Sequence, residues 1–132
     1  MPGPDFFANI TMLNHHRPML LASVLALIGF ACLYATFGQL KAHIDWIDVV
    51  SEGGFALMAA LWLVMILSSR PAGRVTRMLA LGLAGIMLGA WADCMDEFLS
   101  IGKGTLWPHL LEGGFSLGGM LTLTLGLFYW RQ

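Results

Sequence analysis

Charge is scarce in this sequence. Asp, Glu, Lys and Arg together make up 11% of the 132 residues, whereas 58% of the residues are hydrophobic. A soluble domain carries about 25% charged residues, so the composition excludes an ordinary soluble domain and indicates an integral membrane protein. The net charge of −1 points to no charged partner. We expect the chain to be surrounded by the lipid bilayer and to bind no nucleic acid.

Cysteine and the common catalytic motifs are also scarce or missing. Cys32 and Cys94 form no CxxC pair, so we interpret them as small buried side chains rather than as a disulfide or a metal pair. The sequence contains no GxSxG, P-loop or HExxH motif, and its serines have no paired base. We therefore expect that the protein is not an enzyme.

The sequence contains four long apolar stretches. Helix crosses ~30 Å of hydrocarbon in about 20 residues, and the stretches are continuously apolar rather than alternating as in a membrane barrel. The sequence therefore predicts an all-α membrane protein with four transmembrane helices and a disordered or surface-lying tail. The tail is residues 1–17, and the helices are residues 18–40, 49–69, 77–99 and 108–130.

The basic residues predict the orientation. Arg70, Arg74 and Arg77 lie in the link between the second and third helices, and Arg17 and Arg131 flank the first and last helices. Among lysines and arginines, the other two links contain only Lys41 and Lys103. By the positive-inside rule, both termini and the central link lie in the cytoplasm. We expect a multi-pass protein of the bacterial inner membrane.

One short sequence occurs twice. EGGF stands at Glu52–Phe55 and again at Glu112–Phe115, and each copy opens an apolar span. The second and fourth helices run in the same direction, so this pattern predicts two same-orientation hairpin repeats. Independent convergence on a common way of starting a helix is the alternative.

Small residues predict where the helices approach one another. Small-xxx-small patterns let helix backbones come close in a membrane. They occur as Gly85-xxx-Gly89, Ala56-xxx-Ala60 and Gly114-xxx-Gly118. Aromatic residues near the span ends are interpreted as interfacial anchors: Trp46, Trp91, Trp107, Tyr129 and Trp130.

The acidic residues gather on the non-cytoplasmic side. Asp93, Asp96 and Glu97 are spaced i, i+3 and i+4, so a continuing helix places them on one face. His109 and Glu112 are spaced i, i+3 at the start of the last helix. A four-helix bundle brings these groups to one mouth. We expect the following residues to sense a ligand or protons: Asp93, Asp96, Glu97, Glu52, Glu112 and His109.

Carboxylates crowded at a membrane boundary have three physical outcomes. They can hold protons, pair with Lys41 or Lys103, or bind a divalent cation. Carboxylates alone suit Ca²⁺, Mg²⁺ or Mn²⁺, whereas added imidazoles favour Zn²⁺, Ni²⁺ or Cu²⁺. The alternative is that these groups are only solvated helix ends. The side chains predicted to hold such a metal are Asp96, Glu97, Glu112, His109 and His43.

Three short segments carry a resemblance to a known family: Ala92–Phe98, Leu111–Gly113 and Gly126–Arg131. The chain from about residue 78 to 131 resembles the membrane-integral N-terminal input region of bacterial GGDEF-type diguanylate cyclases and sensor histidine kinases. The resemblance implies that the last helix leads into a cytoplasmic output. These 132 residues include no output domain, so we expect an isolated input region or a stand-alone relative with a separate partner protein. The matching site positions are Asp93, Asp96, Glu97 and Glu112.

These observations predict a small sensory or input module with an acidic site at its periplasmic mouth. The module would pass a displacement inward through the last helix to a cytoplasmic output domain or partner protein. A homodimer is a further expectation. Two alternatives remain, namely a small cation or proton transporter or channel subunit, and a structural membrane assembly protein.

Overall fold

A computed structural model of the chain describes residues 3–102, 104 and 106–132. Its elements, in chain order, are α1 (Pro4–His15), α2 (Arg17–Phe37), β1 (Gly38–Leu40), α3 (Trp46–Ser69), α4 (Arg74–Phe98), β2 (Leu99–Ile101), α5 (Trp107–His109), the π-helical segment η1 (Leu110–Gly114) and α6 (Phe115–Arg131). Because α5, η1 and α6 are continuous, the described part contains four helices long and apolar enough to cross a membrane. The prediction of an all-α fold with four such helices is confirmed.

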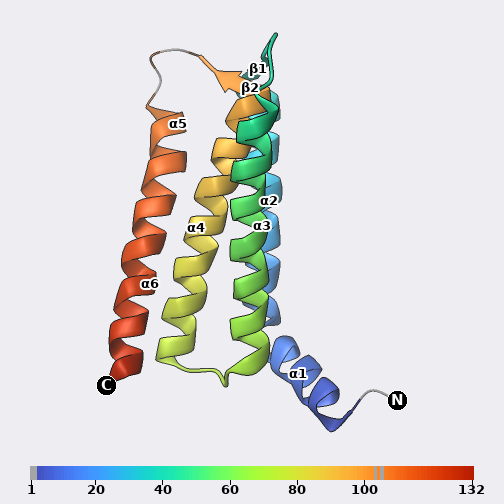
Figure 1. Cartoon of the computed structure of the whole chain (residues 1–132), viewed down its shortest axis with the longest axis vertical. Coiled ribbons are helices and arrows are strands. Elements are labelled where there is room, and N and C mark those ends of the chain that lie inside the picture. The colour runs from blue at the N-terminus through green and yellow to red at the C-terminus, as the bar shows by residue number, and fades with distance from the viewer. Residues whose placement is uncertain (1–2, 103, 105) are drawn as a thin grey trace.

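The four long helices run alternately up and down (Figure 1). Both termini lie at one end of the bundle, here called the terminal end, together with the link between α3 and α4. The strands β1 and β2 lie at the other end, here called the acidic end because the predicted acidic site falls there. Helices α3 and α6 run in the same direction, as any four alternating passes require. This geometry does not test a duplication, so the two hairpin repeats stay a prediction.

Helix α4 is the centre of the bundle. In its most apolar window 56% of the residues are buried, against 17% in α3, 11% in the last helix and 6% in α2. Its own buried leucines and methionine pack with Leu63 and Leu67 of α3 in the hydrophobic core cluster: Leu83, Met87 and Leu88. Since α2 buries only Tyr34 among its residues, α2 and α4 do not occupy equivalent positions in the two halves.

A stripe of glycines brings α4 against α6. A Cβ atom added to Gly85 would lie 2.8 Å from Cα of Gly119, and one added to Gly82 would lie 2.7 Å from Cα of Leu123. No side chain fits into these contacts, so the glycines allow the two backbones to touch. The Gly85-xxx-Gly89 pattern correctly predicted the α4 residues of this contact. The Gly114-xxx-Gly118 pattern did not predict the α6 residues, because a Cβ on Gly118 would have nothing within 4 Å.

The first long helix is shorter than predicted at the acidic end. It ends at Phe37, and residues 38–40 form β1, which pairs antiparallel with β2 through Gly38–Ile101, Gln39–Ser100 and Leu40–Leu99. A Cβ on Gly38 would lie 2.9 Å from Cβ of Leu99. Glycine therefore permits a pairing that the apolar profile of this segment could not distinguish from helix.

The N-terminal tail is helical rather than disordered. Helix α1 starts at Pro4, and Asp5 follows in its first turn. Phe6, Phe7 and Ile10 are exposed on it. Nε2 of His16 lies 3.4 Å from the carbonyl oxygen of Arg70, which joins the start of α2 to the α3–α4 link.

Two residue interpretations from the sequence are corrected. Trp91 is not simply an interfacial anchor, because its Nε1–H donates a hydrogen bond to the carbonyl oxygen of Leu27 at 3.1 Å and so joins α4 to α2. Cys94 is buried as expected, whereas Cys32 is exposed. Trp46 and Trp107 are 64% and 65% exposed, which agrees with anchoring positions.

Candidate functional site

Two carboxyl groups meet where α4 contacts the start of the last helix. The carboxyl groups of Asp93 of α4 and Glu112 of η1 lie next to each other, and both side chains line one cavity. Gly89 precedes Asp93 by one turn on the same face of α4. A Cβ on Gly89 would lie 3.0 Å from the carbonyl oxygen of Glu112 and 2.9 Å from the amide nitrogen of Ser116. The missing side chain at Gly89 therefore lets the backbone of η1 approach until the two carboxyl groups touch.

This carboxyl pair has a chemical requirement. An ionised carboxylate only accepts hydrogen bonds, so two carboxyl groups can share one only when a proton lies between them. Tyr34, which is 0% exposed, adds a second donor: its hydroxyl donates to Oε1 of Glu112 at 3.4 Å. The site thus joins three helical elements, with Tyr34 from α2, Asp93 from α4 and Glu112 from η1.

Glu112 lies in an irregular part of its helix. Residues 110–114 form a π-helical turn, and such turns occur often at functional sites. The other EGGF copy, Glu52–Phe55, lies within the regular helix α3. The two copies therefore differ in backbone conformation, although their sequences are identical.

Glu52 lies near this pair but has no comparable partner. Its closest charged neighbours include Asp93 and Glu97, all of the same sign. Its Oε2 atom is buried and has no hydrogen-bond partner in the described part of the chain. Helix α3 passes close to α4 here, since a Cβ on Gly53 would lie 3.5 Å from Sγ of Cys94. Glu52 is thus a carboxyl group held against other carboxyl groups.

Asp96 and Glu97 belong to a separate arrangement. Nζ of Lys41 lies 3.7 Å from Oδ2 of Asp96 and 3.7 Å from Oε1 of Glu97. The amide of Lys41 also donates to the carbonyl oxygen of Phe98 at 3.1 Å, so the β1–β2 pairing holds the lysine in place. Neutralisation by Lys41 was one of the three outcomes open from the sequence. Lys103, the other lysine considered, lies outside the described residues.

The two histidines predicted to hold a metal, His109 and His43, lie in different surroundings. His109 lines a cavity of about 380 Å³ together with Asp93, Glu112 and Ser116. His43 is exposed in the link after β1 and lines none of the cavities described here. Within residues 3–102, 104 and 106–132, no three His, Cys, Asp or Glu side chains are arranged to hold a metal ion.

Sequence reasoning found most of the carboxyl groups but missed Tyr34. A tyrosine near the end of an apolar span resembles an interfacial anchor, and nothing in its neighbours indicates that it is buried against Glu112. The helical spacing also predicted that Asp93, Asp96 and Glu97 form one group on one face. In the structure they belong to two groups, because they interact with different residues. Asp93 contacts Glu112, and the other two contact Lys41.

Comparison with known proteins finds no relative of this chain. No family model matches the chain, and no curated protein or solved structure matches it either. The fold and the site therefore define a class, namely a small helical membrane protein with four candidate spans in its described part.

Proposed function

We propose that this protein is a non-enzymatic sensory input module that responds to protons at its acidic end. The observation that supports the proposal is that the carboxyl groups of Asp93 and Glu112 lie next to each other, where they can hydrogen-bond only with a proton between them. Following the positive-inside rule, we place the acidic end in the periplasm and the terminal end in the cytoplasm of a bacterial inner membrane.

The proton acts as a removable link between α4 and η1. While it is present, Asp93 and Glu112 hold the two elements together. When it is lost, two negative charges remain close together in a partly buried place, and they repel each other. Glu52 and Asp96 add negative charge nearby, and Tyr34 donates to Glu112. Lys41, at the same end, is paired with Asp96 and Glu97. His109 lines the cavity beside the pair.

The last helix carries the change to the other end. It is continuous from Trp107 to Arg131, so a displacement at η1 moves α6 as a rod along its glycine contact with α4. Helix shifts of about 1–2 Å are a common form of such switching. We propose that an output domain or partner protein in the cytoplasm reads this shift, as the resemblance to input regions of diguanylate cyclases and sensor kinases implies.

Transport is less well supported than sensing. Apart from Tyr34 and Cys94 toward the acidic end and Thr76, whose hydroxyl donates to the carbonyl oxygen of Pro71, the buried side chains in the described core are apolar. A proton path through one copy needs a series of titratable groups across the span, and the described core offers none. A structural role, with no response to any condition, is the outcome against which sensing is tested.

The test measures the distance between α4 and α6 at the terminal end as a function of pH. Spin labels are attached at exposed positions 77 and 131 in a Cys32→Ser chain that retains the buried Cys94. We expect the distance in the purified full chain to change by about 1–2 Å when pH is raised and the carboxyl pair loses its proton. A distance that stays constant across the pH range would contradict the proposed function.

Two variants assign the response to the carboxyl pair. Asp93→Asn keeps a hydrogen bond to Glu112, because the amide donates without a titrating proton, and we expect it to hold the low-pH distance at every pH. Asp5→Asn removes a carboxylate at the far end of the molecule, in α1, and should respond as the unmodified chain does. If Asp93→Asn also responded normally, the pair would not be the sensing site.

A further inference from the structure

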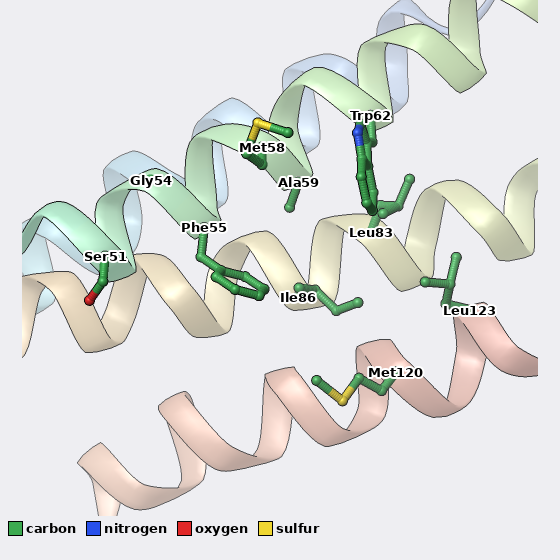
Figure 2. A pocket seen from close by; sticks show the side chains of 10 residues that line it. All are labelled: Ser51, Gly54, Phe55, Met58, Ala59, Trp62, Leu83, Ile86, Met120 and Leu123. Atoms are coloured by element: carbon green, nitrogen blue, oxygen red, sulfur yellow. The ribbon is translucent and has the colours of Figure 1, made fainter. Parts of the chain in front are cut away.

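A groove runs along the side of the bundle between α3 and α6, with α4 as its floor. Figure 2 shows the part nearer the acidic end, a cavity of about 500 Å³ whose lining includes Phe55, Met58 and Met120. A second cavity of about 400 Å³ continues it toward the terminal end. Trp62, Leu83 and Leu123 line both cavities. The two are therefore parts of one groove.

The groove is apolar along its length and basic at one end. Its polar lining side chains are Ser51 near the acidic end, and Ser69 and Arg70 at the terminal end. On α3, the distance from Gly54 to Arg70 is 16 residues, or about 24 Å at 1.5 Å per residue. Half of a ~30 Å hydrocarbon core is about 15 Å, so the groove is long enough for an acyl chain of one leaflet.

Arg70 is poised to bind an anion at this end. Its guanidinium carbon lies 4.6 Å from the centre of the Trp130 ring, and its Nε atom is buried without a hydrogen-bond partner among the described residues. Arg70 also lines the groove, and stacking occupies only the face of its guanidinium, so the terminal N–H groups beyond the buried Nε are the ones that can donate to a phosphate. Arg74 stacks on the neighbouring Tyr129 at 4.9 Å. Neither arginine is paired with a described carboxylate.

We propose that the groove binds one anionic phospholipid, with its phosphate on Arg70 and one acyl chain along Trp62, Leu83 and Leu123. Charge complementarity identifies the occupant. A zwitterionic lipid or a helix from a second copy would fill the apolar part equally well, but only an anionic headgroup uses the unpaired guanidinium. Basic pockets between membrane helices bind anionic headgroups in this way. The proposal does not depend on proton sensing at the acidic end.

Native mass spectrometry of the purified full chain in detergent tests this proposal. The two probes are phosphatidylglycerol and phosphatidylcholine with identical acyl chains. We expect phosphatidylglycerol to bind more tightly, and Arg70→Gln to weaken it about fivefold, which corresponds to the ~1 kcal/mol of one basic residue near anionic lipid. Arg77→Gln, an equal loss of charge at an exposed position of the same region, should leave the affinity unchanged.

A second pair of variants tests the acyl-chain part of the groove. A Cβ on Gly54 has nothing within 4 Å, so Gly54→Leu is compatible with the fold and fills the groove far from Arg70. We expect it to weaken both lipids at least threefold. Gly29→Leu, at an equally open position on α2 outside the groove, should have no effect.

Two results would overturn the proposal. Equal binding of both lipids, unaffected by Arg70→Gln, would identify ordinary surrounding lipid. A dimer that forms without lipid and is abolished by Gly54→Leu would identify the groove as an interface with a second copy.

Discussion

At the residue scale, the carboxyl groups of the acidic end differ by their partners rather than by their positions in the sequence. Asp96 and Glu97 face Lys41, Asp93 and Glu112 lie next to each other, and Glu52 has a buried oxygen without a partner among the described residues. A buried polar atom that makes no hydrogen bond costs free energy. The same residue type is therefore stabilising at one place and destabilising at another, within one end of one bundle.

Glu52→Gln is expected to raise the free energy of unfolding by about 1 kcal/mol at neutral pH, because it removes a charge held near Asp93 and Glu97 and adds an amide that donates to them. Denaturant titration of the detergent-solubilised chain measures the change. Glu97→Gln is the matched control: it loses a partly exposed contact with Lys41, so its free energy of unfolding should stay equal or fall by up to about 1 kcal/mol. Destabilisation by Glu52→Gln would show that this carboxylate has a partner after all.

Tyr34→Phe removes the hydroxyl that donates to Glu112 and leaves the ring in place. We expect the free energy of unfolding to fall by about 1 kcal/mol, the usual net value of one hydrogen bond. Tyr129→Phe is the control, because its ring contact with Arg74 survives and its hydroxyl lies at the exposed terminal end. Equal losses in both variants, measured by the same titration, would mean that the Tyr34–Glu112 contact contributes nothing.

At the element scale, the contact between α4 and α6 positions the site. Gly82, Gly85 and Gly89 lie on one stripe of α4, and Asp93 continues that stripe by one turn. Lipid tails are as apolar as leucine side chains, so burying apolar side chains between helices contributes little free energy in a membrane. Close backbone packing therefore holds the helices together. The geometry of the Asp93–Glu112 pair therefore depends on residues that carry no functional group.

Gly85→Ala places a methyl group 2.8 Å from Cα of Gly119 and should force the two helices apart. Overpacking of this kind costs about 1–3 kcal/mol, which denaturant titration in detergent can resolve. Gly118→Ala adds the same methyl group on α6, where nothing lies within 4 Å, and should change the stability by less than about 0.5 kcal/mol. If Gly118→Ala were the more damaging variant, the glycine contact would lie on the other face of α6.

The elements were predictable from the sequence to the extent that apolar length determines them. Four spans follow from composition because lipid satisfies no backbone polar group and thus requires helix. The strand β1 and the π-helical turn η1 were missed, since each depends on a tertiary contact. Gly38 must meet Leu99, and Gly89 must meet the backbone of Glu112, before either conformation is favoured. The acidic residues were predictable as a group, but their pairing was not, because it follows from this helix contact.

At the scale of the whole molecule, the two proposed sites lie at opposite ends of one helix. Glu112 is near the start of the last helix, and Trp130, which stacks on Arg70, is near its end. A displacement of α6 that begins at the carboxyl pair would therefore also move one wall of the lipid groove. If both proposals hold, bound anionic lipid and the proton on the pair should influence each other, since coupling between two sites is reciprocal.

The direction in which the bundle crosses the membrane decides which compartment the carboxyl pair faces. The positive-inside rule predicts the terminal end in the cytoplasm, because Arg70, Arg74 and Arg77 lie there. Single cysteines placed at the exposed positions His43 and Arg74 in a Cys32→Ser chain test this in intact cells with a membrane-impermeant thiol reagent. We expect the cysteine at position 43 to be labelled and the one at 74 to react only after the membrane is permeabilised. The reverse pattern would turn the carboxyl pair toward the cytoplasm, so that any proton response would report the pH inside the cell.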